Sequence, residues 1–193
     1  KPGRIFASRM TGACNVDDLV TRMLVGCVQL GSFPFGKGAF ECGAPVDKVA
    51  SAIVGLGLEA QRRQSDEAMT FHLFLEEPIS LTPLFLALCA DHGLRPIEFA
   101  SWLDELANDE SNTLLPLIHE LRAVEAGHLI IPKFDNKFTT SVMTCSGISL
   151  GPSLEYVYFC KQLQYMRAIG VLPAATSPPG RVVAEVVFRS LKP

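Results

Sequence analysis

The sequence predicts a single α+β domain that is mostly helical and carries small antiparallel β-hairpins. Apolar residues recur at helical spacing in several stretches, and two other stretches alternate apolar and polar residues around short turn sequences. With 193 residues, 48% of them hydrophobic, the chain can build one sizeable core. We therefore expect one compact domain over residues 1–193, with sub-lobes 1–66 and 67–193 as the alternative division.

The first predicted helix spans residues 15–30. Asn15 can cap it, and an apolar face follows at the spacing of helical turns. The members of this face are Leu19, Val20, Met23, Leu24, Cys27 and Val28. Residues 31–45 are rich in glycine and phenylalanine, so we expect a loop there.

A second helix is predicted to start near Pro45 and to end within residues 59–67. Gly55 and Gly57 lower its helix propensity by ~1 kcal/mol each relative to alanine, which favours close approach by another backbone. These glycines make a poor phosphate-binding loop, because no strand precedes them and the sequence contains neither GxGxxG nor GxxxxGKS/T.

Residues 69–75 alternate in character and predict a strand. Three helices are predicted next, over residues 80–93, 95–106 and 112–127. Three helices before a hairpin is the order of winged helix-turn-helix domains, and residues 86–106 have the length and glycine-containing turn of a helix-turn-helix pair. Winged-helix-like units are therefore one expected form of the fold.

Two hairpins complete the predicted elements. The first covers residues 128–145 and turns at Asp135 and Asn136, and the second covers residues 171–189 and turns at the sequence Ser-Pro-Pro-Gly. A helix over residues 153–169 separates them. The order helix, glycine, hairpin thus occurs twice, and an internal repeat is one interpretation of it.

Charge divides the chain into three parts. Residues 64–132 hold twelve acidic side chains against Arg95 and Arg122, whereas residues 1–63 hold eight basic and five acidic and residues 133–193 hold seven basic and three acidic. An acidic central surface on one copy can meet basic flanks on another. We therefore expect a non-enzymatic assembly module whose partner is another protein or a second copy of itself.

The alternative function is nucleic-acid binding by the C-terminal helix and hairpin. The helix over residues 112–127 has the position of a reading helix but carries Glu120 and Glu125, which the phosphate backbone repels. The C-terminal unit is better suited, and its candidate binding residues are Lys133, Lys137, Lys161, Arg167, Arg181 and Arg189.

Catalytic chemistry is not expected, because potential nucleophiles and bases are scattered. The nearest sets are Cys89 with Asp91 and His92, and Cys145 with His119 or His128. His72 has no second metal ligand two residues away, so we expect no metal and no cofactor. Trp102, at helical spacing with hydrophobic neighbours, is predicted to anchor the core.

The six cysteines form no CxxC pair, which favours buried, reduced thiols in an intracellular, cytoplasmic protein. No hydrophobic run reaches the ~18 residues that a membrane-spanning helix needs. We therefore expect no membrane span.

Overall fold

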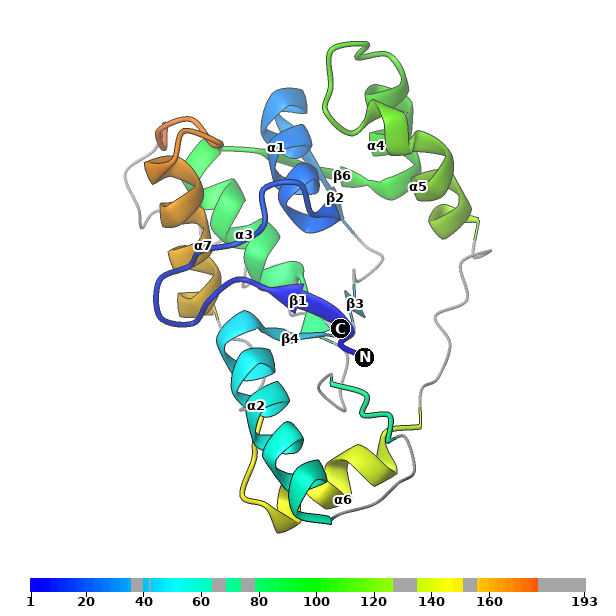
Figure 1. The fold of residues 1–193 in the computed structure, drawn as a ribbon. Helices are drawn as coiled ribbons and strands as arrows, with labels where there is room; N and C mark the ends of the chain where they lie inside the picture. The colour runs from blue at the N-terminus through cyan, green and yellow to red at the C-terminus, as the bar shows by residue number, and fades with distance from the viewer. Residues whose placement is uncertain are drawn as a thin grey trace, which may run out of the picture.

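A computed structural model describes residues 1–35, 40–41, 43–63, 69–73, 79–126, 135–150 and 156–176. The helices are α1 (Leu19–Leu30), α2 (Val46–Arg63), α3 (Thr82–His92), α4 (Phe99–Ala107), α5 (Ile118–Glu125), α6 (Lys137–Cys145) and α7 (Tyr156–Ala168), with a 3₁₀ turn at Leu115–Leu117 (Figure 1). The strands are β1 (Arg4–Phe6), β2 (Ser32–Phe35), β3 (Phe40–Glu41), β4 (Gly43–Pro45), β5 (Ile79–Ser80) and β6 (Arg95–Glu98).

The longer strand pairs are parallel. β1 pairs with β4 and β2 pairs with β6 in parallel register, whereas the two-residue strands β3 and β5 pair antiparallel. The predicted α+β fold with antiparallel hairpins is therefore wrong. Parallel partners cannot be joined by a tight turn, and helices separate them along this chain, so local turn signals could not reveal the pairing.

Residues 1–3 extend β1 with a further parallel partner. The backbone nitrogen of Lys1 donates to Phe71 O at 2.6 Å, Leu73 N donates to Lys1 O at 3.0 Å, and Gly3 N donates to Leu73 O at 3.1 Å. Pro2 and Leu73 form a parallel bridge. Of the strand predicted over residues 69–75, the structure shows an isolated parallel bridge at Leu73 with its flanking hydrogen bonds, and residues 74–75 lie outside the described residues.

Strands occupy the turn region of the predicted helix-turn-helix and much of the predicted loop at residues 31–45. Residues 95–98 form β6 between α3 and α4, where the second helix was expected to begin, and they pair with β2. β2 itself lies in the stretch 31–45 that was predicted to be a loop, together with β3 and β4. Winged-helix geometry is therefore excluded for this segment.

The hairpin predicted over residues 128–145 is wrong in its return strand, which is the helix α6. Thr139, Val142 and Met143 are buried at helical spacing, and the latter two pack in a cluster with α2. Tertiary packing has overridden the strand propensity of the β-branched residues. Of the second hairpin, residues 171–176 are described and form no strand, and residues 177–189 lie outside the described part.

The helix predictions agree better with the structure. The first helix begins at Leu19 with Asp18 as its cap, since Asp18 Oδ2 accepts from Val20 N at 3.0 Å, while Asn15 Oδ1 accepts from Asp17 N in the turn before it. α3 ends as expected at Gly93, whose φ is 65°. No helix in the described part of the chain has both the length and the hydropathy to cross a bilayer.

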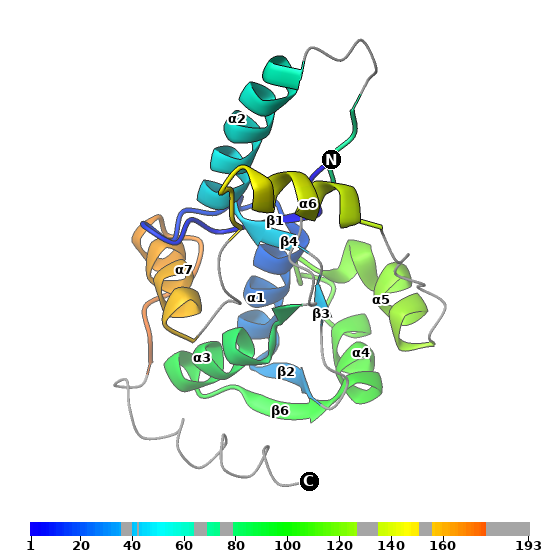
Figure 2. The ribbon, with the colours of Figure 1, turned by 90° about the horizontal axis from the view of Figure 1, so that it is seen from below.

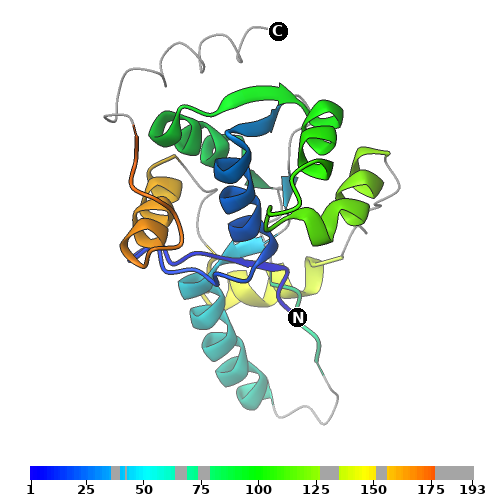
Figure 3. The same ribbon diagram turned by 90° about the horizontal axis from the view of Figure 1, so that it is seen from above.

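Two clusters of buried side chains form the core. The larger joins β1, α1, β2, α3, α4, α5 and α7, and contains Trp102, which is fully buried and donates from Nε1 to Ser32 O at 3.4 Å. Trp102 is thus confirmed as a core anchor. The smaller cluster joins β4, α2, Leu73 and α6. Figures 2 and 3 show α2 projecting from the rest of the molecule, and α6 packs against it through Val142 and Met143.

Candidate functional site

Ligands of open parallel sheets bind beyond the carboxyl ends of the strands. β1 ends at Phe6 and β4 ends at Pro45, so residues 7–18 and the first turn of α2 lie at that edge. We call residues 7–18 the β1 loop. It is one of the surfaces that this general rule indicates, since the parallel pair β2 and β6 has a carboxyl edge of its own.

The β1 loop is closed by its own hydrogen bonds. Ser8 N donates to Ala13 O and Gly12 N donates to Ser8 O, both at 2.8 Å. Ser8 Oγ also accepts from Met10 N at 3.2 Å and from Thr11 N at 3.3 Å. The loop therefore keeps its shape through local bonds, which is the condition for a preorganised site.

Contacts with two helices fix the β1 loop in place. Arg9 N donates to Asp47 Oδ1 at 2.8 Å, which ties the loop to α2. From α7, Lys161 Nζ donates to Arg9 O at 3.1 Å and Tyr158 Oη donates to Ala7 O at 2.8 Å. The loop is thus held from both sides.

Gly12 makes the closest approach to α7. Its φ is +75°, and a Cβ on it would lie 2.1 Å from Lys161 O and 2.9 Å from Gln162 N. Both atoms belong to the backbone, so neither can move aside as the end of a side chain would. Only glycine fits at this contact.

Burial keeps the polar groups beneath the loop neutral. It raises the pKa of the Tyr158 phenol well above its ordinary range, and the nearby Asp47 carboxylate adds to that rise. Burial also raises the pKa of the Cys14 thiol. Both groups are therefore hydrogen-bonding and packing elements at neutral pH, while Met10, Thr11 and residues 15–17 are exposed on the loop.

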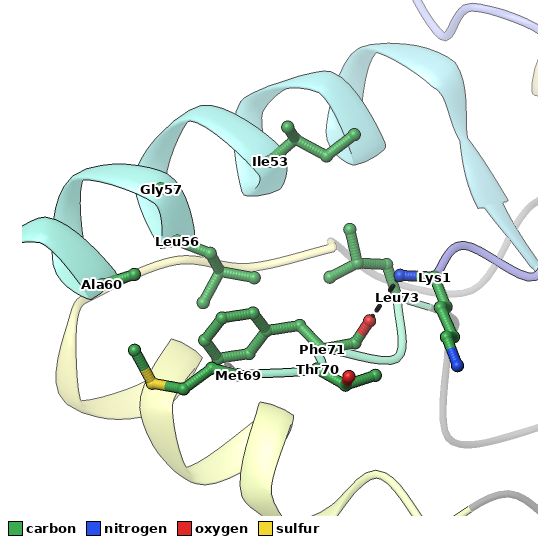
Figure 4. Close-up of a pocket in the computed structure, with 9 residues that line it drawn as sticks. All are labelled: Lys1, Ile53, Leu56, Gly57, Ala60, Met69, Thr70, Phe71 and Leu73. Carbon is green, nitrogen blue, oxygen red and sulfur yellow. Dashed lines mark hydrogen bonds between the residues drawn. The ribbon is translucent and has the colours of Figure 1, made fainter. Parts of the chain in front are cut away.

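A cavity of about 310 Å³ lies beside Lys1, at the end of the segment 1–6 that is farther from the β1 loop. Its walls are Lys1, Ile53, Leu56, Gly57, Ala60, Met69, Thr70, Phe71 and Leu73. Figure 4 shows Leu56 and Ala60 of α2 facing Phe71 and Met69 across it. We call this cavity the α2 pocket; its lining is largely apolar, and Phe71 also stacks on Phe138 at a centroid distance of 5.6 Å.

The residues predicted to bind nucleic acid are dispersed. Lys137 is exposed at the start of α6, Lys161 contacts the β1 loop, and Arg167 pairs with Asp91 of α3. Lys133, Arg181 and Arg189 lie outside the described residues. Sequence reasoning missed the β1 loop, although the small polar run from Ser8 to Gly12 between a strand and a helix was a usable signal.

Of the two thiols suggested as nucleophiles, Cys89 is a packing group. Cys89 is buried, donates to Leu94 O at 3.0 Å and has a raised pKa because of burial. Cys27 is also buried, Cys14 and Cys160 are half-buried, and Cys145 is exposed; none of these five described cysteines forms a disulfide. Within the described residues, no group of three His, Cys, Asp or Glu side chains could hold a metal ion.

Comparison with solved structures places this architecture among reductase domains of biosynthetic assembly lines. The chain is similar to the terminal R domain from the myxalamid PKS-NRPS biosynthetic pathway, with 29% identity and a TM-score of 0.72 over 91% of this chain and 45% of that one. It also resembles the reductase (R) domain of a nonribosomal peptide synthetase from Mycobacterium tuberculosis in fold, with 19% identity and a TM-score of 0.64 over 87% of this chain and 45% of that one.

Two curated proteins with similar sequences are also named as reductases. The large subunit of L-2-aminoadipate reductase from Eremothecium gossypii is 32% identical over 123 residues, which cover 62% of this chain and 9% of that protein. L-2-aminoadipate reductase from Schizosaccharomyces pombe is 26% identical over 96% of this chain and 14% of its own length. The chain therefore spans about a tenth of these relatives. No protein-family model matches the sequence.

These similarities overturn the functional expectations from sequence. Relatives named as reductases contradict both the non-enzymatic, self-associating assembly module and the nucleic-acid-binding alternative. The expectation of no enzyme failed because it was based on a missing catalytic set within these residues. A segment that spans a small part of longer relatives need not contain that set.

Gly55 and Gly57 do not fit the phosphates of a nicotinamide dinucleotide. Such a cofactor binds a glycine-rich turn between a strand and a helix N-terminus. Gly55 and Gly57 lie inside α2, which begins at Val46, and the Cβ position of Gly55 is already 2.7 Å from Ile148 Cδ1. The predicted close approach at Gly55 is thus made by a side chain, and none occurs within 4 Å of Gly57.

Proposed function

We propose that this chain is part of a reductase domain of the kind found in nonribosomal peptide synthetases and L-2-aminoadipate reductases. The observation that supports it most is the similarity to the myxalamid R domain, which extends over 91% of this chain. The parallel pairing of β1 with β4 and with residues 71–73 agrees with that proposal. The reaction class is reduction of a carbonyl carbon.

Within such a domain, we propose that the reduced nicotinamide that donates the hydride binds outside the described residues. Hydride transfer to a carbonyl is the chemistry that a reduced nicotinamide supplies. Because Gly55 and Gly57 cannot form its phosphate site, the contribution of this chain is to position and enclose the substrate. That role requires a rigid surface near the carboxyl ends of parallel strands.

The β1 loop has the properties for that role. Its backbone is fixed from α2 through Asp47 and from α7 through Tyr158, so its exposed face has one shape. Lys161 is exposed and its Nζ contacts the loop at Arg9 O, and Arg9 is itself a half-buried cationic residue of the loop. Cationic groups of this kind recognise carboxylates and phosphates, so we propose that the substrate carries an anionic group that contacts Arg9.

The test uses the full-length protein that contains this chain. It is mixed with reduced nicotinamide cofactor and a panel of aldehydes and acyl thioesters, with and without a carboxylate group, and products are identified by mass spectrometry. We expect reduction of the anionic members of the panel. Failure to reduce any member would contradict the reductase assignment.

The position of the substrate is tested by a matched pair of variants. Arg9→Gln should raise KM for an anionic substrate by about tenfold with little change in kcat, because it removes a charge-assisted contact made equally in the ground and transition states. Arg122→Gln removes the same charge from the exposed surface of α5 and should leave KM unchanged. Equal KM values in the two variants would place the substrate away from the β1 loop.

A further inference from the structure

One face of α2 is apolar and uncovered in the described structure. Val46, Ala50, Val54 and Leu58 recur every four residues and are all exposed, and Val54 and Leu58 are exposed by 65% and 55%. The spacing of four places them in one row along the helix. A second row, Val49, Ala52 and Leu56, is buried against the smaller core.

The α2 pocket continues this apolar face. Ile53 is exposed by 55% and lines the pocket, as do Gly57 and Ala60. Across the pocket, Phe71 stacks on Phe138, which is itself half exposed. We call the row Val46, Ala50, Val54 and Leu58, together with Ile53, the pocket and Phe138, the α2 surface.

Folded proteins seldom leave a contiguous apolar surface of this kind on a projecting helix unless another polypeptide covers it. On its pocket side the outer half of α2 faces Met69 and Phe71, whereas Val54 and Leu58 stay exposed. Figures 2 and 3 show the helix projecting from the rest of the molecule. The three parallel segments β4, residues 1–6 and residues 71–73 also make a sheet smaller than those that parallel strands usually form.

We propose that the α2 surface is the docking face for the rest of the same reductase domain, and this proposal rests on the function proposed above. The matched myxalamid R domain supplies the reason to choose this occupant, because this chain covers only 45% of it and more than half of that domain lies beyond the match. The docked segment presents apolar side chains, one of which enters the α2 pocket between Leu56 and Phe71.

The test measures accessibility in the full-length protein. Val54→Cys and Val157→Cys form a matched pair, because each replaces a valine that is 65% exposed, on α2 and α7 respectively. Maleimide labelling of each new cysteine is quantified by peptide mass spectrometry, which separates it from native thiols such as Cys145. We expect labelling at position 54 to be at least about tenfold slower than at position 157, because a covered thiol reacts slowly.

Equal labelling rates at the two positions would show that the α2 surface is open and would overturn the proposal. The occupant is identified by attaching a photo-crosslinker at Leu58→Cys in a mixture of isotopically light and heavy protein. Links to residues of the same polypeptide beyond residues 1–193 support the proposal. Light-to-heavy links would identify a second copy instead, and links to a small molecule or to no polypeptide would also overturn it.

The two proposals fail in different ways. A protein that reduces the carbonyl panel but labels freely at position 54 is a reductase whose remaining part docks elsewhere. A protein that reduces no member of the panel but is protected at position 54 by its own polypeptide has lost the reductase assignment, while the α2 surface keeps its role as an internal interface.

Discussion

The Cβ position of Gly12 lies 2.1 Å from the carbonyl oxygen of Lys161, so the β1 loop and α7 are joined by a contact that admits no side chain. This contact connects two segments that are far apart in the sequence. It also fixes Arg9 and Lys161 relative to each other, because Lys161 Nζ donates to Arg9 O from the same turn of α7. The shape of the proposed substrate surface depends on it.

Gly12→Ala should therefore destabilise the chain more than an ordinary glycine replacement. Positive φ costs a non-glycine residue about 1–3 kcal/mol, and the backbone clash with Lys161 adds to it. Urea denaturation, followed through the fluorescence of the single tryptophan Trp102, measures the free energy of unfolding. Gly31→Ala is the control, since its φ is +66° but no described atom lies within 4 Å of the new Cβ. Equal losses in the two variants would refute the contact.

Tyr158→Phe should lower stability at neutral pH by about 1–3 kcal/mol, because it leaves the buried Ala7 carbonyl without its donor. It should also change the response to alkali. The folded state raises the pKa of Tyr158, so the unfolded chain ionises first and the native protein loses stability as pH rises above about 10. The variant should lose less stability over that range, as measured by urea denaturation at several pH values; an identical alkaline slope would contradict this.

Arg167→Met should raise the pKa of His92. Burial lowers that pKa, the Asp91 carboxylate raises it and the Arg167 guanidinium lowers it, so removing the guanidinium leaves Asp91 to favour the imidazolium. NMR titration of the imidazole measures the change. Arg122→Met removes the same charge at a distance and should leave the His92 titration unaltered; a shift of equal size in both variants would rule out the local cause.

His92 also contributes to the pH dependence of the free energy of unfolding. Because the folded state lowers the pKa of His92, the unfolded chain takes up a proton first as pH falls below about 6.5. His92→Gln should reduce the part of acid destabilisation that appears in this window. Urea denaturation at pH 7 and at pH 5.5 tests it, and an unchanged difference between the two values would assign acid sensitivity to other groups.

Gly57→Ala should stabilise the isolated chain by about 0.5–1 kcal/mol, since it removes backbone freedom from a helix interior and meets no neighbour within 4 Å. Gly55→Ala differs by two positions, but its Cβ would be 2.7 Å from Ile148 Cδ1, so most of this gain should be lost. Thermal unfolding of the two variants compares them. A larger gain at position 55 would show that Ile148 does not pack as described.

Local patterns in the sequence identified most helices, because the necessary information lies within one or two turns. Leu24 and Cys27 mark the buried face of α1, and Gly93 marks the end of α3. The same patterns failed where a distant partner decides the structure. The glycine and phenylalanine content of residues 31–45 suggested a loop, yet Pro34 within this stretch lies in β2 opposite Ile97 of β6, and no turn signal connects the two.

The candidate site was harder to predict than the fold for the same reason. Ser8, Gly12 and Asp47 acquire their roles from α7 and from the carboxyl ends of β1 and β4, and none of these relationships is visible along the chain. The basic residues selected by charge have other partners in the described structure. Lys161 contacts the Arg9 backbone and Arg167 contacts Asp91, so their charge holds elements together.

Residues 1–6 connect the two clusters of buried side chains, since Phe6 is part of the larger and the backbone of residues 1–3 pairs with Leu73 of the smaller. The contacts of residues 1–6 are therefore complete only after residue 73 and α7 have reached their positions in the fold. Pairing between segments this far apart in the sequence is slow, because closing the long loop costs entropy before the stabilising contacts form. We therefore expect the pairing of residues 1–6 to limit the folding rate, and we expect the two clusters to unfold in a single cooperative transition.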